Sequence, residues 1–146
     1  MVKCSHGDYM RTFYLFKIKK NILKSYKYNY EELFSLLEDI HLRSNEDIIL
    51  CYEIFKSIVS PIDKDKYSEY IKSKNICHEN YICYNDIHNI NDYYDDENTR
   101  MLINNSYIKI SSNKNIPSFF FDMKSFKNIF VCDFEHHDYF LLEEVI

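Results

Sequence analysis

The sequence has little of the residues on which many enzyme sites depend, because its 146 residues include one Gly, two Pro and no Trp. Phosphate-binding loops, dinucleotide-binding motifs and nucleophile elbows need glycine where the backbone turns sharply or approaches a ligand closely. Gly7 alone cannot build any of them. The sequence therefore argues against nucleotide-binding enzymes, and we expect a protein that is not an enzyme and holds no cofactor.

Ala and Gln are absent as well, whereas Ile, Lys, Asn, Tyr and Phe together make up half of the chain. Ala is the best helix former and Asn and Tyr are poor ones, so the needs of a fold do not explain this composition. A coding bias toward A/T-rich codons explains it more simply, as in certain large DNA viruses and in a few protozoa and bacteria. Lys, Asn and Tyr therefore carry little information about function.

No apolar run approaches the roughly 18–20 residues of a membrane-spanning helix. The first ten residues, MVKCSHGDYM, also lack the apolar segment of a secretory signal. The length and the apolar fraction of 46% are those of one ordinary globular domain. We expect a single domain over residues 1–146 without a transmembrane segment, in the cytoplasm or nucleus; the oligomeric state stays open.

Five cysteines at uneven spacing indicate free thiols in a reducing compartment rather than a disulfide framework. Zinc needs four converging thiolate or imidazole groups, and two parts of the chain contain such groups. The candidate ligands are Cys77, Cys83, His88, Cys132 and His136. The short paired spacings typical of structural zinc sites are missing, so we expect no bound metal and keep a zinc-stabilised domain as an alternative.

Apolar residues recur at three- and four-residue steps through the first half of the chain, which predicts four amphipathic helices. These helices cover about residues 9–26, 29–40, 47–59 and 64–73. Capping signals and a proline mark their ends: Asn29 with Glu32, Ser44 with Asp47, and Pro61.

The second half gives a weaker pattern. Residues 75–98 are rich in Asn, Asp, Tyr and His and predict a loop with room for one short helix. Alternation over residues 107–110 predicts a strand, followed by a turn at 111–115 and a helix over 123–130. The whole pattern predicts a mainly α fold, a compact helical domain of five or six helices, to which a small β-hairpin near 106–121 can be added.

Two groups of residues are candidates for binding a partner. The first 28 residues carry a net charge of +6 within a chain of net charge −5. The expected helix over 9–26 gathers four bases on one face, where they could contact phosphates, an acidic partner or an anionic membrane: Lys17, Lys20, Lys24 and Lys27. Phe119 and Phe120 would form a partner site if they lay on the surface and part of the core otherwise.

A dense titratable stretch over residues 133–138 offers His and carboxylate groups. Neighbouring residues on a strand or helix point in different directions, so this stretch does not predict one catalytic site. We expect no catalytic residues.

Residues 116–130 resemble the stretch after the repeats in poxvirus ankyrin-repeat host-range proteins. The shared residues are Pro117 and Phe121-Asp122-Met123-Lys124-Ser125-Phe126. The resemblance implies a viral origin. In that family the ankyrin repeats bind host proteins and a terminal F-box-like segment recruits a ubiquitin ligase. This chain has no Thr-Pro-Leu-His repeat core and no F-box-like C-terminus, so ligase recruitment does not carry over.

The leading hypothesis is a non-enzymatic, poxvirus-like protein of the host cytoplasm or nucleus. It would modulate the host immune response or apoptosis by binding a host protein through a helix face or groove. The alternatives are the zinc-stabilised domain and a nucleic-acid binder that uses the basic N-terminal helix. Arg is rare in this chain. Because Arg binds phosphates through two parallel hydrogen bonds, its scarcity argues against nucleic-acid binding.

Overall fold

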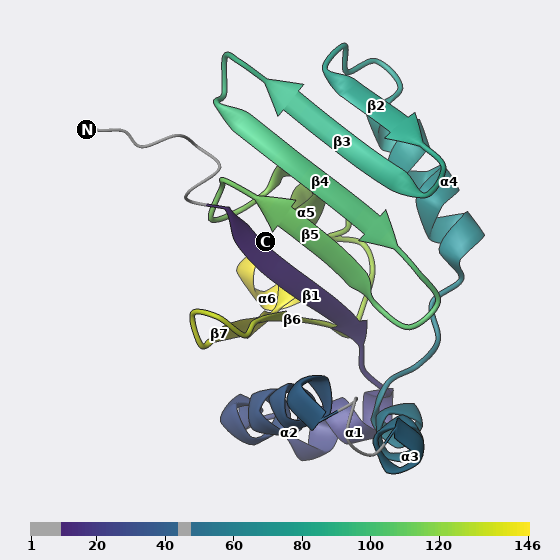
Figure 1. Ribbon diagram of the computed structural model, residues 1–146, viewed down its shortest axis with the longest axis vertical. Helices are drawn as coiled ribbons and strands as arrows, with labels where there is room; N and C mark the ends of the chain where they lie inside the picture. Colours follow the sequence, from purple (N-terminus) through teal and green to yellow (C-terminus); the bar gives the residue numbers. More distant parts are fainter. Residues whose placement is uncertain (1–9, 44–47) are drawn as a thin grey trace.

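The computed structural model describes residues 10–43 and 48–146, and a seven-stranded antiparallel sheet forms the centre of this part of the chain (Figure 1). The strands are β1 (Arg11–Lys17), β2 (Tyr81–Tyr84), β3 (Ile87–Asp92), β4 (Glu97–Ile103), β5 (Ile108–Ser112), β6 (Ile129–Asp133) and β7 (Asp138–Leu141). Their order in the sheet is β2-β3-β4-β5-β1-β6-β7. The first strand of the sequence therefore lies inside the sheet, between β5 and β6.

Six helices occur within the described residues. They are α1 (Lys20–Ser25), α2 (Tyr30–Arg43), α3 (Ile48–Ile58), α4 (Lys64–Asn75), α5 (Ser118–Asp122) and α6 (Leu142–Val145). Helices α4, α5 and α6 pack on one side of the sheet, which we call the α4 face, and α1, α2 and α3 lie on the opposite side, the α2 face (Figure 1).

Each face of the sheet has its own apolar core. On the α4 face, Phe13 and Leu15 of β1 pack with Phe119 and Phe120 of α5 and with Ile71 of α4. On the α2 face, the core joins strands β1, β6 and β7 to helices α1, α2 and α3 through these residues: Phe16, Phe130, Cys132 and Leu141 with Leu23, Leu33, Phe34, Leu37 and Ile58. Strand β6 is buried at all five positions because helices cover both of its sides.

The turns of this glycine-poor chain use other residues in the left-handed backbone region. Asn85 (φ 57°), Asp96 (φ 49°) and His137 (φ 50°) lie in the turns before β3, β4 and β7, and Asn128 (φ 65°) directly precedes β6. Asn and Asp tolerate this conformation best after glycine because a short polar side chain can bond locally to the backbone. A shortage of glycine therefore does not prevent tight hairpins here.

The predicted mainly α fold, with its compact bundle of helices, is wrong. The antiparallel sheet is the central element, and the helices cover its two faces instead of forming a bundle of their own. The predicted helices over 29–40, 47–59 and 64–73 are confirmed as α2, α3 and α4. The capping signal Ser44–Asp47 and residues 1–9, which include Cys4 and Gly7, lie outside the described residues.

The predicted helix over residues 9–26 is wrong for its first half, which forms β1. Strand β1 lies in the middle of the sheet with covered faces on both sides, so apolar residues follow one another without alternation from Phe13 to Phe16. A doubly buried strand of this kind matches a helical period as well as a strand period. Only α1, over Lys20–Ser25, keeps the predicted conformation.

Three predictions for the second half also need correction. Residues 75–98 form β2, β3 and the start of β4 instead of a loop. The strand near 107–110 is confirmed as β5, but it pairs with β4 and β1, so no hairpin closes over 106–121. The helix predicted over 123–130 is wrong because α5 ends at Asp122, and Ile129 and Phe130 belong to β6.

Candidate protein-binding surface

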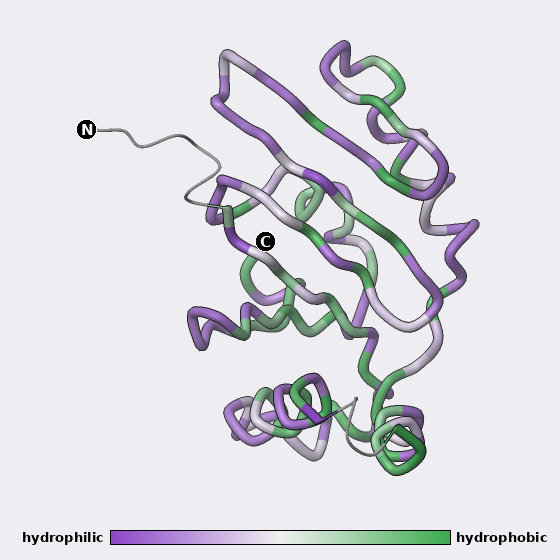
Figure 2. The backbone as a smooth tube through the Cα atoms, viewed as in Figure 1, coloured by the Kyte–Doolittle hydropathy of each residue, from purple (hydrophilic) through white to green (hydrophobic). Residues whose placement is uncertain are grey.

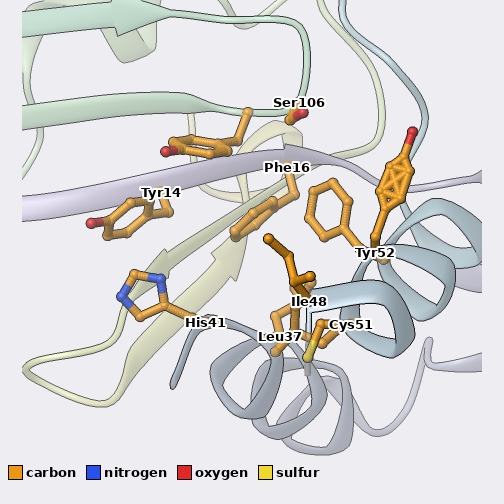
Figure 3. Close-up of a pocket in the computed structure, with 11 residues that line it drawn as sticks. Tyr14, Phe16, Leu37, His41, Ile48, Cys51, Tyr52 and Ser106 are labelled. Atoms are coloured by element: carbon orange, nitrogen blue, oxygen red, sulfur yellow. The ribbon is translucent and has the colours of Figure 1, made fainter. Parts of the chain in front are cut away.

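An apolar groove of about 580 Å³ lies where α2 and α3 meet the sheet (Figure 3). Strand β1 supplies Tyr14 and Phe16, and α2 supplies Leu37 and His41. The other walls come from α3 and from the loop between β4 and β5: Ile48, Cys51, Tyr52, Phe55, Ser106 and Tyr107, with Ile40 of α2 completing the lining. The groove thus joins four separate segments of the chain, of which β1 and the β4–β5 loop are far apart in the sequence.

Aromatic contacts fix the floor of the groove. The ring of Phe16 lies 5.9 Å from that of Phe55 and 6.1 Å from that of Tyr107, and the ring of Tyr14 lies 4.9 Å from that of His41. Edge and tilted ring pairs at these distances are favourable beyond the area that they bury. We infer that the floor is preformed, so a partner would not have to order it on binding.

His41 contributes an uncharged ring to this groove. Burial, reinforced by the nearby cation Lys109, lowers the pKa of His41 below its ordinary value. Its ring also stacks on Phe134, with the two centroids 4.8 Å apart. The imidazole is therefore neutral at pH 7, and no residue that lines the groove carries a full charge at that pH.

Helix α3 carries apolar residues on its outer side as well as on its buried side. Ile48 is 70% exposed and Ile49 is 75% exposed, and Leu50 and Tyr52 are more than half exposed. Figure 2 shows α3 as a hydrophobic segment, whereas α2 alternates between hydrophobic and hydrophilic turns. Glu53 and Lys56 lie further along the helix, so the exposed apolar residues gather near its start. Contiguous exposed apolar residues commonly mark an interaction site.

A polar cluster ties the start of β1 to the hairpin of β6 and β7. Arg11 donates from Nε to the buried carboxylate of Asp133 and from a terminal nitrogen to Asp138, both at 2.9 Å. The Nδ1 atom of His136 lies 2.8 Å from Asp133, while His137 contacts Glu31 of α2 at 2.8 Å. Each group is engaged in a structural contact, and the cluster contains no Ser or Cys beside a base. It does not form a nucleophilic site.

The structure separates the residues proposed as zinc ligands. Cys83 and His88 are paired neighbours on β2 and β3, and Ser68 and Tyr81 engage the two ring nitrogens of His88 at 3.0 and 2.7 Å. Cys77 is exposed beyond α4. Cys132 and His136 lie at the other end of the sheet, on β6 and in the following turn. The described residues contain no group of three or more metal-binding side chains.

The predicted partner-binding residues are also dispersed. Lys17 ends β1, Lys20 and Lys24 are exposed on α1, and Lys27 follows α1, so these bases do not share one helix face. Phe119 and Phe120 are completely buried under the sheet. Sequence reasoning missed the outer face of α3, because the amphipathic helix predicted over 47–59 is expected to bury its apolar residues, whereas Ile48 and Tyr52 are exposed. The only available signal was the excess of apolar residues over residues 48–52.

These features define a mixed α/β protein that carries an uncharged apolar groove beside a helix with exposed apolar residues. Among the described residues, no helix is both long and apolar enough to cross a membrane. Residues 11–145 match the family described as "Sporulation inhibitor of replication protein SirA", and the chain belongs to this family. No curated protein matches the chain.

Family membership corrects the predicted origin and role. The family is bacterial, so the resemblance to poxvirus host-range proteins is wrong, and with it the prediction of a viral modulator of host immunity or apoptosis that binds a host protein. Residues 116–130 form α5, the following turn and the start of β6, and a biased composition explains their likeness to a viral sequence. The zinc-binding and nucleic-acid-binding alternatives gain no support from the family.

Proposed function

We propose that this chain inhibits DNA replication by binding a protein of the replication machinery, and that it does so without catalysing a reaction. The family description names an inhibitor of replication in sporulation, which supports the inhibitory role. The exposed apolar side of α3 and the groove beside it support protein binding as the mode of action. The chain would act in the cytoplasm, where a bacterial chromosome is replicated.

The chemistry of the groove favours a protein partner over DNA. A surface that binds DNA neutralises phosphates with Lys and Arg, whereas none of the residues lining the groove is Lys or Arg. The net charge of −5 would repel DNA from the chain as a whole. Apolar and aromatic side chains are the ones that dominate protein–protein contacts.

Expression in a spore-forming bacterium during growth tests the proposal. The ratio of origin-proximal to terminus-proximal DNA, measured by sequencing, should fall toward one when the chain is expressed. The substitution Ile49→Asp places a charge among the exposed apolar residues at the start of α3. It should weaken partner binding at least about tenfold and restore the ratio, while the midpoint of thermal unfolding changes little because the side chain is exposed.

Ile76→Asp is the matched control. Ile76 is 82% exposed beyond the end of α4, away from the groove, so this variant should inhibit replication as well as the unaltered chain does. An unaltered chain that leaves the ratio unchanged would contradict the proposed function. A folded Ile49→Asp variant that still inhibits fully would show instead that α3 is not the contact surface.

A further inference from the structure

The sheet presents a second exposed surface, the α2 face of strands β2, β3, β4 and β5. Residues that pair across antiparallel strands share a face, and the registers place two rows of side chains there. The first row runs through Tyr84, Ile87, Leu102 and Lys109, and the second through Ile82, Asn89, Arg100 and Ser111. We call these two rows the open face.

The open face lacks the layer that covers the rest of the sheet. Helix α4 packs on the opposite side of the same strands, and α1 to α3 cover the α2 face only at β1, β6 and β7. Within residues 10–43 and 48–146 no helix lies over the open face (Figure 1). Ile82 is 64% exposed and Tyr84 is 72% exposed, and Leu102 is exposed beside them. A sheet with an apolar row of this kind normally packs against a helix.

Charge distinguishes the open face from the remainder of the molecule. It carries two cations, Arg100 and Lys109, and no Asp or Glu among the side chains of its two rows, although the chain has a net charge of −5. Arg100 is exposed, and neither cation forms an ion pair with another described residue. The adjacent carboxylate, Asp86, is already paired with Lys64 of α4 at 3.2 Å.

We propose that the open face binds an acidic amphipathic helix of a partner protein, with the apolar stripe of that helix on Ile82, Tyr84 and Leu102 and its carboxylates on Arg100 and Lys109. A helix of the partner would supply the missing layer over the apolar row. Carboxylates on that helix would supply the ion-pair partners that Arg100 and Lys109 lack among the described residues. Opposed charges of this kind govern the choice of partner and the rate of encounter. This surface contains no residue of α3, although it borders the groove at Lys109, whose Nζ lies 5.9 Å from the ring centroid of Tyr14.

Two synthetic peptides test the proposal. Each has about 18 residues, enough to form a helix alone, and an identical stripe of Leu; one stripe is flanked by Glu and the other by Lys. Fluorescence anisotropy should show that the unaltered chain binds the Glu peptide at least about tenfold more tightly than the Lys peptide. General attraction to the net charge of −5 predicts the opposite preference, so the sign of the difference is decisive.

Reversal of the two cations supplies the second measurement. The double variant Arg100→Glu with Lys109→Glu should lose the preference for the Glu peptide and bind the Lys peptide more tightly. The matched control, Lys66→Glu with Lys124→Glu, makes the same change in net charge at exposed residues beyond the opposite face, and it should keep the preference of the unaltered chain. Thermal unfolding of both variants establishes that they are folded.

Four results would overturn the proposal. The first is that the unaltered chain binds both peptides equally or prefers the Lys peptide. The second is that Ile49→Asp no longer binds the Glu peptide, which would place the peptide on α3. A dimer in light scattering that the Arg100 and Lys109 reversal dissociates would identify a second copy of the chain as the occupant. Binding of a single-stranded DNA oligonucleotide that the same reversal abolishes would assign the face to nucleic acid. None of these results depends on inhibition of replication, so the two proposals can fail separately.

Discussion

The two parts of the sheet differ in how many of their faces are covered. Strands β1, β6 and β7 lie between α1 to α3 on one side and α5 and α6 on the other, whereas β2 to β5 have helices on the α4 face alone. The difference is visible in the burial patterns of the strands. Strand β6 is buried at every position, and β4 alternates strictly between buried and exposed side chains. We therefore expect a core substitution in the doubly covered part to cost the most stability, and the singly covered part leaves one face of its strands exposed for the binding that we propose.

Truncation of Phe130 tests the doubly covered part. Phe130 lies on β6, is completely buried, and its ring is 5.5 Å from that of Tyr30 on α2. Phe130→Ala should lower the free energy of unfolding by about 3–5 kcal/mol, because the loss of apolar burial adds to the cost of a cavity. Urea denaturation measures this loss. A loss below about 1 kcal/mol would show that α2 does not pack on β6 as described.

A fall in pH should lower the free energy of unfolding through His88, which lies in the singly covered part of the sheet. This residue is fully buried between β3 and α4, and burial, with a smaller effect of Lys72, lowers the pKa of His88 to about 4. The unfolded chain takes up a proton near pH 6.5 and the folded chain does not, so stability is complete above pH 6.5 and falls as the pH drops toward 4. The loss should reach about 3 kcal/mol.

Urea denaturation at several pH values between 7 and 4 measures this effect. His88→Gln has no titrating ring, so its stability should change less over the same interval, whatever its stability at pH 7. Hydrogen exchange would locate the change, which we expect in α4 and in β2 to β4. Equal pH dependence of the two proteins would show that His88 is not the group responsible.

Substitution on the open face should have little effect on stability. Tyr84 is on the edge strand β2, and its side chain is largely exposed. Tyr84→Ala should therefore change the free energy of unfolding by about 0.5 kcal/mol or less. A loss comparable to that of Phe130→Ala would show that a further part of the chain covers this face, and the contrast between the two parts of the sheet would disappear.

The helices were easier to predict than the strands for a physical reason. Helices α2 and α4 each lie on the surface of the sheet, so a periodic apolar stripe records their single buried side. Strand β1 has two buried sides and shows no clear alternation. The strands within residues 75–98 are short and are separated by turns rich in Asn and Asp. The composition of the whole region is therefore typical of a loop and hides the strands.

The two surfaces proposed to bind partners could not be predicted from the sequence. The groove joins Phe16, Leu37, Ile48 and Tyr107 from four separate segments, and only the strand order of the sheet brings these segments together. The open face depends on the registers of four strands, since Arg100 and Lys109 share a face only through the pairing of β4 with β5. A periodic pattern within one segment contains no information about such pairing.

The sequence alone was enough to argue against glycine-dependent phosphate sites, to show no apolar run of membrane-spanning length, and to predict three of the helices, because these properties belong to single residues or single segments. The hairpins form despite the shortage of glycine, since Asn, Asp and His occupy the left-handed turn positions. Tertiary structure alone decided which apolar residues became core and which became surface. Burial depends on what packs above a side chain, so Phe119 and Phe120 ended in the interior while Ile48 and Ile49 remained exposed.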